Sequence, residues 1–464
     1  MKKLLISTFV VLGFFLIRKT EAQELPRRAI LGLQATALSD SLAQKHGLPH
    51  GMLVVSLTPG ATAQQMGIRV GDILYAVDQQ PVHTPQELAA VNQRLRPGKA
   101  LSIQVLRNGK RKSLRGKALP RPLVTTPSAK VSYGQVPFRQ GLLRTITYAP
   151  HTPGRHPAVL FIPGFPCRSI DDYEGTPYSQ LIEGWSKLGY VVMMVEKPGL
   201  GDNVDTPDCL QIDLFTEIEA FEQGLLHLRQ HPGVNSQEVF VFGHSMGGII
   251  APVLSQKHDL KGVMVYGSPY RPWFEFAADM FRFQRPALGA DYIESEKTMR
   301  LLHHVLYRYF VLAQHPDTIA AADPAYKKIL EEEFQHKGGD FFWSRDYRYW
   351  QQIDQLDLTK AWAETDERVL AIWGEYDFQV VNADDHKGIV DIVNHYHPGH
   401  ATFLKLEGTN HSFIKVPGMV EGVKQMQKRD AAYNRTHFNT RLVTETDAWM
   451  RQVLQSSPKA LPGK

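Results

Sequence analysis

The chain has 464 residues, of which 43% are hydrophobic and 21% are charged. This composition is typical of a soluble globular protein of about three units, and it excludes a disordered or fibrous chain. The formal net charge of +5 falls to about +2 without residues 1–22, so the body lacks the basic surplus that a nucleic-acid partner needs.

The first 22 residues have the pattern of a secretory signal peptide. Lys2 and Lys3 precede an apolar run over residues 4–17, and Ala22 supplies a small residue for cleavage. The run is shorter than the roughly 20 residues that span a bilayer. The basic pair Arg18-Lys19 leaves a retained membrane anchor open, and otherwise we expect a periplasmic or secreted protein without membrane contact.

Residues 27–117 predict a small β-rich domain. An apolar strand over 52–57 runs into a Thr-Pro-Gly-Ala turn, and a short helix over 63–68 precedes a strand that starts at 70–74. Apolar spacing predicts a helix over 84–95. Asn108-Gly109 then predicts a tight hairpin after the strand over 101–106.

This block resembles the PDZ domains of bacterial envelope proteases, on the residues at 30–33, 59–63, 67–68 and 70–74. The resemblance implies a groove beside helix 84–95, where a partner peptide adds a strand and its C-terminal carboxylate meets a loop of backbone N–H groups. That loop is formed by Ile30, Leu31, Gly32 and Leu33. The alternative is a spacer that only packs on the enzyme, because a fold does not fix its use.

A Pro-containing polar stretch over 118–130 predicts a linker, and residues 131–464 predict a second, larger domain. There, strands alternate with helical segments, which indicates a mostly parallel sheet with helices on both faces. One helix carries a stripe that we expect to be core, formed by Phe215, Ile218, Phe221, Leu225 and Leu228.

Ser245 is the predicted nucleophile. A strand over 239–242 runs into Gly-His-Ser-Met-Gly at 243–247, and a helix-like segment over 249–254 follows. This G-x-S-x-G lies in the strand–turn–helix setting in which a strained turn exposes a serine above a sheet. The alternative is a glycine-rich turn with a passive serine.

A serine nucleophile needs a base and an acid that orients it, here in the chain order serine, acid, histidine. Asp377 follows the buried-strand pattern at 368–373, and His411 follows the next one at 401–406. Both therefore belong at the sheet edge that carries Ser245. Asp377 as a helix cap, or Glu375 as the acid, are the alternatives.

His395, His397 and His400 cluster in a loop with Pro and Gly. Their spacing lacks a carboxylate motif such as H-E-x-x-H, so a solvated loop is favoured over a metal site. We expect neither a metal nor another cofactor.

An acyl-transfer oxyanion needs backbone donors. The N–H after the nucleophile, that of Met246, is one candidate. The second is the N–H of Phe165, in the Pro-Gly-Phe-Pro loop that follows the strand over 158–162.

From Tyr133 to about Leu454 the chain resembles α/β-hydrolases, nearest the serine-aminopeptidase and dienelactone-hydrolase branch. The strand over 190–195 with the Gly-rich turn at 196–202 also matches, whereas Pro163-Gly164 departs from the usual His-Gly. The resemblance implies that the strands ending at 162 and 195 are neighbours. Their loops would then bring Cys167 and Cys209 within reach of a disulfide, with two buried thiols as the alternative.

Between the strand over 262–266 and the acid strand lies an insertion, about residues 270–362, that is rich in aromatic residues. It predicts a helical cap that shapes a pocket over the serine, or one whose rings only bind the cap to the body.

The sequence thus predicts an exported serine hydrolase that cleaves an ester, amide or peptide bond through an acyl-enzyme, with a front domain that recruits a peptide or protein. The alternatives are an adaptor with a vestigial hydrolase body and an acyltransferase.

Overall fold

The computed structural model describes residues 25–456 apart from 39–40, 42, 45–46, 49 and 429. The predicted signal peptide lies outside these residues. In the part of the chain that is described, no helix is both long enough and apolar enough to cross a membrane.

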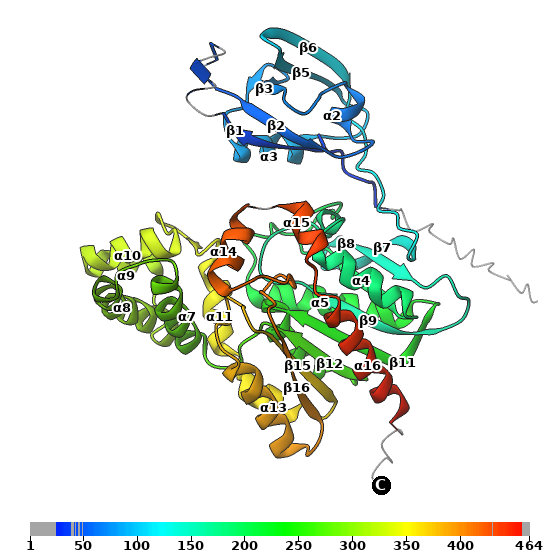
Figure 1. Ribbon diagram of the computed structural model, residues 1–464, viewed down its shortest axis with the longest axis vertical. Coiled ribbons are helices and arrows are strands. Elements are labelled where there is room, and N and C mark those ends of the chain that lie inside the picture. Colours follow the sequence, from blue (N-terminus) through cyan, green and yellow to red (C-terminus); the bar gives the residue numbers. More distant parts are fainter. Residues whose placement is uncertain are drawn as a thin grey trace, which may run out of the picture.

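The N-terminal domain is an antiparallel sheet in the order β1-β2-β3-β5-β6, with β4 paired to β3 (Figure 1). Asn108 and Gly109 both have positive φ, as the predicted hairpin turn between β5 and β6 requires. Leu31, Val54, Leu74 and Ile103 are among the residues of its separate small core. The elements are β1 (Leu33–Ala37), β2 (Met52–Leu57), α2 (Thr62–Gln65), β3 (Ile73–Val77), β4 (Gln80–Pro81), α3 (Pro85–Arg94), β5 (Ala100–Arg107) and β6 (Lys110–Lys117).

The second domain is built on an eight-stranded sheet in the order β16-β15-β12-β11-β9-β10-β8-β7. Strands β9 to β12, β15 and β16 are parallel, whereas β7 and β8 form an antiparallel hairpin. Residues 130–149 therefore depart from the expected alternation of strand and helix. The strands are β7 (Lys130–Phe138), β8 (Gly141–Ala149), β9 (His156–Ile162), β10 (Val191–Val195), β11 (Val234–His244), β12 (Gly262–Tyr266), β15 (Arg368–Gly374) and β16 (Ala401–Leu406).

Both faces of this sheet are covered by helices, as predicted. Alternation along β9 sends Leu160 into the core with α5, α6 and α13, and Phe161 into the core with α4 and α16. The other residues of the predicted apolar stripe are buried, whereas Phe215, at the start of α5, is 43% exposed. The helices are α4 (Pro177–Lys187), α5 (Leu214–Gln230), α6 (Met246–Ser255), α13 (Asp384–Tyr396), α14 (Met419–Lys428), α15 (Ala431–Thr436) and α16 (Arg441–Gln455), with a 3-10 turn η1 (Ile170–Tyr173).

The segment between β12 and β15 is a mostly helical cap that lies at one side of the sheet (Figure 1). Its aromatic side chains pack on one another and on the body, as in the contact of Trp350 with Phe165 at 5.6 Å between ring centroids. The cap contains α7 (Trp273–Ala287), α8 (Tyr292–Leu306), a π-helical turn η2 (Tyr307–Val311), α9 (Pro316–Ala322), α10 (Pro324–Phe334), β13 (Phe341–Phe342), β14 (Arg345–Asp346), α11 (Tyr347–Gln355) and α12 (Leu358–Glu364).

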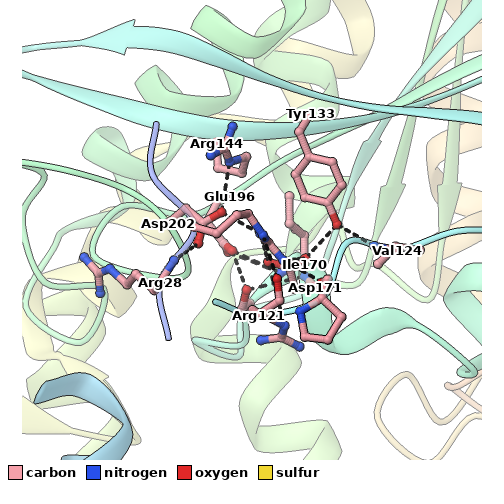
Figure 2. Close-up of polar contacts among 12 residues, drawn as sticks. Arg28, Arg121, Val124, Tyr133, Arg144, Ile170, Asp171, Glu196 and Asp202 are labelled. Atoms are coloured by element: carbon pink, nitrogen blue, oxygen red, sulfur yellow. Dashed lines mark hydrogen bonds and ion pairs between the residues drawn. The ribbon is translucent and has the colours of Figure 1, made fainter. Parts of the chain in front are cut away.

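Ion pairs join the segments on either side of the N-terminal domain to the second domain (Figure 2). Arg27 donates to Asp171 at 2.8 and 3.0 Å and also contacts Asp202, while Arg121 pairs with Asp172 at 2.6 Å. The backbone N–H of Arg28 donates to Asp202 at 2.8 Å. Both ends of the domain are therefore attached to the loops that follow β9 and β10.

Candidate active site

Ser245 occupies a strained turn between β11 and α6. Its φ of 55° and ψ of −120° lie in a region that L-residues seldom adopt, and the residue is the N-cap of α6. Its N–H donates to the Tyr266 carbonyl on β12 at 2.8 Å. The turn needs glycine on both sides, because a Cβ at Gly243 would lie 2.3 Å from the Gly247 carbonyl oxygen, and one at Gly247 would lie 2.2 Å from that of Ile162.

Asp377 and His411 meet at the ends of β15 and β16. His411 Nδ1 lies 2.8 Å from Asp377 Oδ2, and Asp377 is fully buried. Since an ionised carboxylate only accepts, Nδ1 carries the proton and Nε2 is left as a base. The other oxygen of Asp377 accepts from the N–H groups of Gln379 and Val380, so the capping role and the contact with His411 coexist.

The rival acid, Glu375, is engaged elsewhere. Its carboxylate accepts from Lys405 Nζ at 2.6 Å and from the Gly408 N–H at 2.8 Å. Together these two hydrogen bonds hold the pKa of Glu375 below its ordinary value. The contacts leave Asp377 as the carboxylate that orients the imidazole.

His244, next to the serine, fixes the backbone that carries His411. Its Nε2 lies 2.8 Å from the His411 carbonyl oxygen, and Tyr178 Oη lies 2.9 Å from its Nδ1. Burial, followed by the nearby His411, lowers the pKa of His244 well below its ordinary value. A neutral His244 that donates through Nε2 and accepts through Nδ1 satisfies both contacts.

Gly267, the residue after β12, lies beside the imidazole of His411 and the carboxylate of Asp377. A Cβ on Gly267 would lie 2.9 Å from His411 Nδ1 and 2.7 Å from Asp377 Oδ2. The preceding residue, Tyr266, accepts the Ser245 N–H. Within the described residues no hydrogen bond joins Ser245 Oγ to His411, and such bonds often tighten only when substrate is bound.

The two candidate oxyanion donors flank the serine. Met246 is the first residue of α6, and Gly164, which precedes Phe165, would place a Cβ 3.5 Å from Ser245 Oγ. In the described part of the chain, the N–H groups of Met246 and Phe165 have no hydrogen-bond acceptor. Both are thus left to a ligand or solvent.

Cys167 and Cys209 form a disulfide with Cα atoms 5.9 Å apart. Their loops follow β9 and β10, which pair in parallel as the resemblance implied. Cys167 lies two residues after Phe165, so the bond joins the loop of the candidate oxyanion donor to the loop that follows β10.

The remaining predicted residues lie outside this site. In the N-terminal domain, β1 is the edge strand beside α3, and the N–H of Leu31 already donates to Asn92 Oδ1 at 2.8 Å. In the histidine cluster, His397 Nε2 and His400 Nδ1 each hydrogen-bond to a backbone carbonyl, those of Ala363 and Asp366. Among the described residues, no group of three or more His, Cys, Asp or Glu residues could hold a metal ion.

One buried ionic cluster, beneath the loop of Phe165, was missed in the sequence. Lys197, Glu217 and Arg345 are each at most 1% exposed, and Glu217 pairs with the two cations at 2.8 and 2.6 Å. The only signal was the position of charges in apolar surroundings, directly after β10 and within the core helix α5. Arg345 comes from the cap, where no pattern linked it to the other two.

Comparison with known proteins gives a match for each domain. Residues 29–117 match the PDZ domain model, and residues 159–419, more than half of the chain, match that of the alpha/beta hydrolase family. The branch within that family stays a prediction.

Three curated relatives match parts of the chain. The magnetosome formation protease MamE of Magnetospirillum gryphiswaldense is 32% identical over 30% of this chain and 17% of its own length. Esterase EstD of Thermotoga maritima is 22% identical over 65% of this chain and 63% of its own length. A probable periplasmic serine endoprotease, DegP-like, of Halomonas elongata is 33% identical over 19% of each. The chain therefore spans less than two thirds of each relative.

The region that matches the alpha/beta hydrolase family contains part of β9, the parallel strands β10, β11, β12, β15 and β16, the strained serine turn and the Asp377–His411 pair. The chain belongs to the alpha/beta hydrolase family.

Proposed function

We propose that the protein is an exported serine hydrolase that cleaves a carboxylic ester, amide or peptide bond through an acyl-enzyme. The observation that carries this proposal is the strained φ of Ser245 at the N-terminus of α6, beside the hydrogen-bonded pair of Asp377 and His411. A serine, an imidazole and a carboxylate at adjacent strand ends suit nucleophilic acyl transfer.

The proposed reaction gives each of these residues a defined role. Ser245 Oγ attacks the carbonyl carbon while His411 Nε2 accepts its proton, and Asp377 stabilises the imidazolium that forms. The N–H groups of Met246 and Phe165 hold the oxyanion. His411 then protonates the leaving group. In the second half of the reaction His411 takes a proton from water, which attacks the acyl carbon, and returns that proton to Ser245 Oγ as the acyl group leaves.

The N-terminal domain is proposed to recruit a peptide or protein. The edge strand β1 beside α3 offers a place where a peptide can add a strand. The loop from Ile30 to Leu33 would meet its terminal carboxylate. Two relatives that match this domain are named as proteases, whereas EstD is named as an esterase, so a panel of aryl esters against aminoacyl and dipeptide arylamides decides the substrate class.

Three observations support export to the periplasm or beyond. The first 22 residues have the pattern of a signal peptide. The Cys167–Cys209 disulfide persists in an oxidising compartment, and one relative is named as periplasmic. Fractionation of cells that express the full chain, with N-terminal sequencing of the mature protein, tests this assignment.

A fluorophosphonate probe tests the catalytic proposal. Wild type should be labelled and Ser245→Ala should not, whereas Ser412→Ala, a control serine beside the base, should be labelled like wild type. If none of the three proteins is labelled and peptide binding is retained, the proposal of an enzyme is wrong and the adaptor function takes its place. Products that carry the acyl group on added alcohols or amines would identify an acyltransferase.

A further inference from the structure

The loop that carries the second oxyanion donor rests on a buried ionic cluster, Lys197, Glu217 and Arg345. Lys197 Nζ donates to the Gly164 carbonyl at 2.6 Å, and Arg345 Nη1 donates to the Phe165 carbonyl at 2.8 Å. Two consecutive carbonyls next to Ser245 are thus each held by a cation.

Glu217 holds both cations in place. Its Oε1 lies 2.8 Å from Lys197 Nζ, and its Oε2 lies 2.6 Å from Arg345 Nη2. Tyr349 adds a hydrogen bond to Glu217 at 3.2 Å and a ring face 3.9 Å from the Arg345 guanidinium. The cluster contains two cations and one carboxylate. Burying such charged groups costs a large free energy of desolvation unless they are paired and hydrogen-bonded.

Planarity links these contacts to the oxyanion donor. The Gly164 carbonyl and the Phe165 N–H belong to one trans peptide unit, so they point in opposite directions. A cation that fixes the carbonyl therefore fixes the N–H. It also withdraws electron density through the peptide and makes the N–H a stronger donor.

We propose that Lys197, Glu217 and Arg345 are positioning residues that aim the Phe165 N–H at the oxyanion and place a net positive charge behind it. Arg345 lies in the cap, so the cap contributes a side chain that supports the oxyanion hole. The inference rests on the proposed function, because it assumes an oxyanion formed at Ser245.

The cluster also predicts an alkaline limit to activity. Burial is the largest influence on Lys197 and lowers its pKa to about 8, against the attraction of Glu217. The titratable and charged groups that face Lys197 are Glu217 on α5, Arg345 on β14 and the adjacent Glu196. As the pH rises through about 8, Lys197 loses its proton and its positive charge, and kcat should fall.

Variants of the two cations test the proposal on an activated aryl ester. Loss of one oxyanion donor costs about 100- to 1,000-fold in kcat, and a misaimed donor should cost about 10- to 100-fold. We therefore expect Lys197→Met and Arg345→Met to lower kcat by about 10- to 100-fold and to change KM less than about threefold. Arg345→Lys, which keeps a cation, should recover part of the loss.

The matched control is Arg285→Met. Arg285 is also a cap arginine, and it pairs with Glu333 instead of the loop. Its kcat should match that of wild type. Inhibition by an alkyl trifluoromethyl ketone, which forms a tetrahedral adduct with the serine, should weaken in the cluster variants by the same factor as kcat.

The outcomes separate this inference from the function that it deepens. Turnover that survives Ser245→Ala would overturn the function itself. Turnover that depends on Ser245 but keeps its kcat in Lys197→Met and Arg345→Met would overturn only the positioning role. If neither variant folds, the wild-type profile decides, since a kcat that stays level from about pH 7 to about pH 10 contradicts the role of Lys197.

Discussion

Replacing Glu196 by glutamine should flatten the pH dependence of the free energy of unfolding. Glu196 follows β10 and is fully buried, next to the junction of the two domains (Figure 2). Burial raises its pKa to about 8 from an ordinary value of 4.5, against the hydrogen bond from Ser169 and with a further contribution from Asp171.

The sign and size follow from proton linkage. Between about pH 4.5 and about pH 8 the folded protein keeps the Glu196 proton and the unfolded chain loses it. The contribution is therefore complete below about pH 4.5 and is lost as the pH rises through about 8. At about 1.4 kcal/mol for each tenfold change in proton affinity, the whole effect is on the order of 5 kcal/mol.

Urea unfolding of wild type and Glu196→Gln at several pH values measures this effect. The difference between their free energies of unfolding should change by several kcal/mol from about pH 5 to about pH 8. The exposed Glu331→Gln is the control and should follow wild type. A difference between wild type and Glu196→Gln that stays constant over this range would refute the reasoning.

Two further predictions concern Asp377 and the Cys167–Cys209 disulfide. Asp377→Asn should lower kcat by on the order of a thousandfold or more, because the imidazole loses its orienting carboxylate, whereas Glu375→Gln should keep kcat within about threefold in the same ester assay. Removing the disulfide by Cys167→Ala with Cys209→Ala should lower the free energy of unfolding by about 4 kcal/mol, as estimated from its sequence separation of 42 residues. Denaturant unfolding that shows no loss would mean that the bond does not restrict the unfolded chain.

The fold and the convergence of Asp377 with His411 could be predicted because the sequence records them locally. Each residue follows a buried-strand pattern, and parallel strands bring their carboxyl ends to one edge. The Gly-rich turn around Ser245 likewise reflects a steric need that is local to β11 and α6. Local patterns of this kind can be recognised in the sequence without any knowledge of distant contacts.

Other features depend on contacts between segments that have no common pattern. Phe215 fits the apolar spacing of α5, yet it lies at the helix start where the N–H meets Gln352 of the cap, and its ring stays exposed. Apolar spacing shows which side of a helix faces inward, but not at which residue the neighbouring segments begin to bury that side. Glu217 is close by on the same helix, and only the tertiary structure shows that Lys197 and Arg345 reach it.

The antiparallel start of the second domain was also beyond the sequence pattern. Strands β7 and β8 are joined by a tight turn in which Arg139 has a positive φ. This residue type gives no turn signal as strong as Asn-Gly. A tertiary contact supports the turn instead, since the Arg139 side chain pairs with Glu219 on α5 at 2.7 Å.

Peptide mapping by mass spectrometry, on protein quenched with acid during turnover of an activated ester, tests the central claim most directly. The account predicts one acyl group on the peptide that contains Ser245, and none in Ser245→Ala. Turnover without this adduct, or an adduct on another residue in wild type, would contradict it.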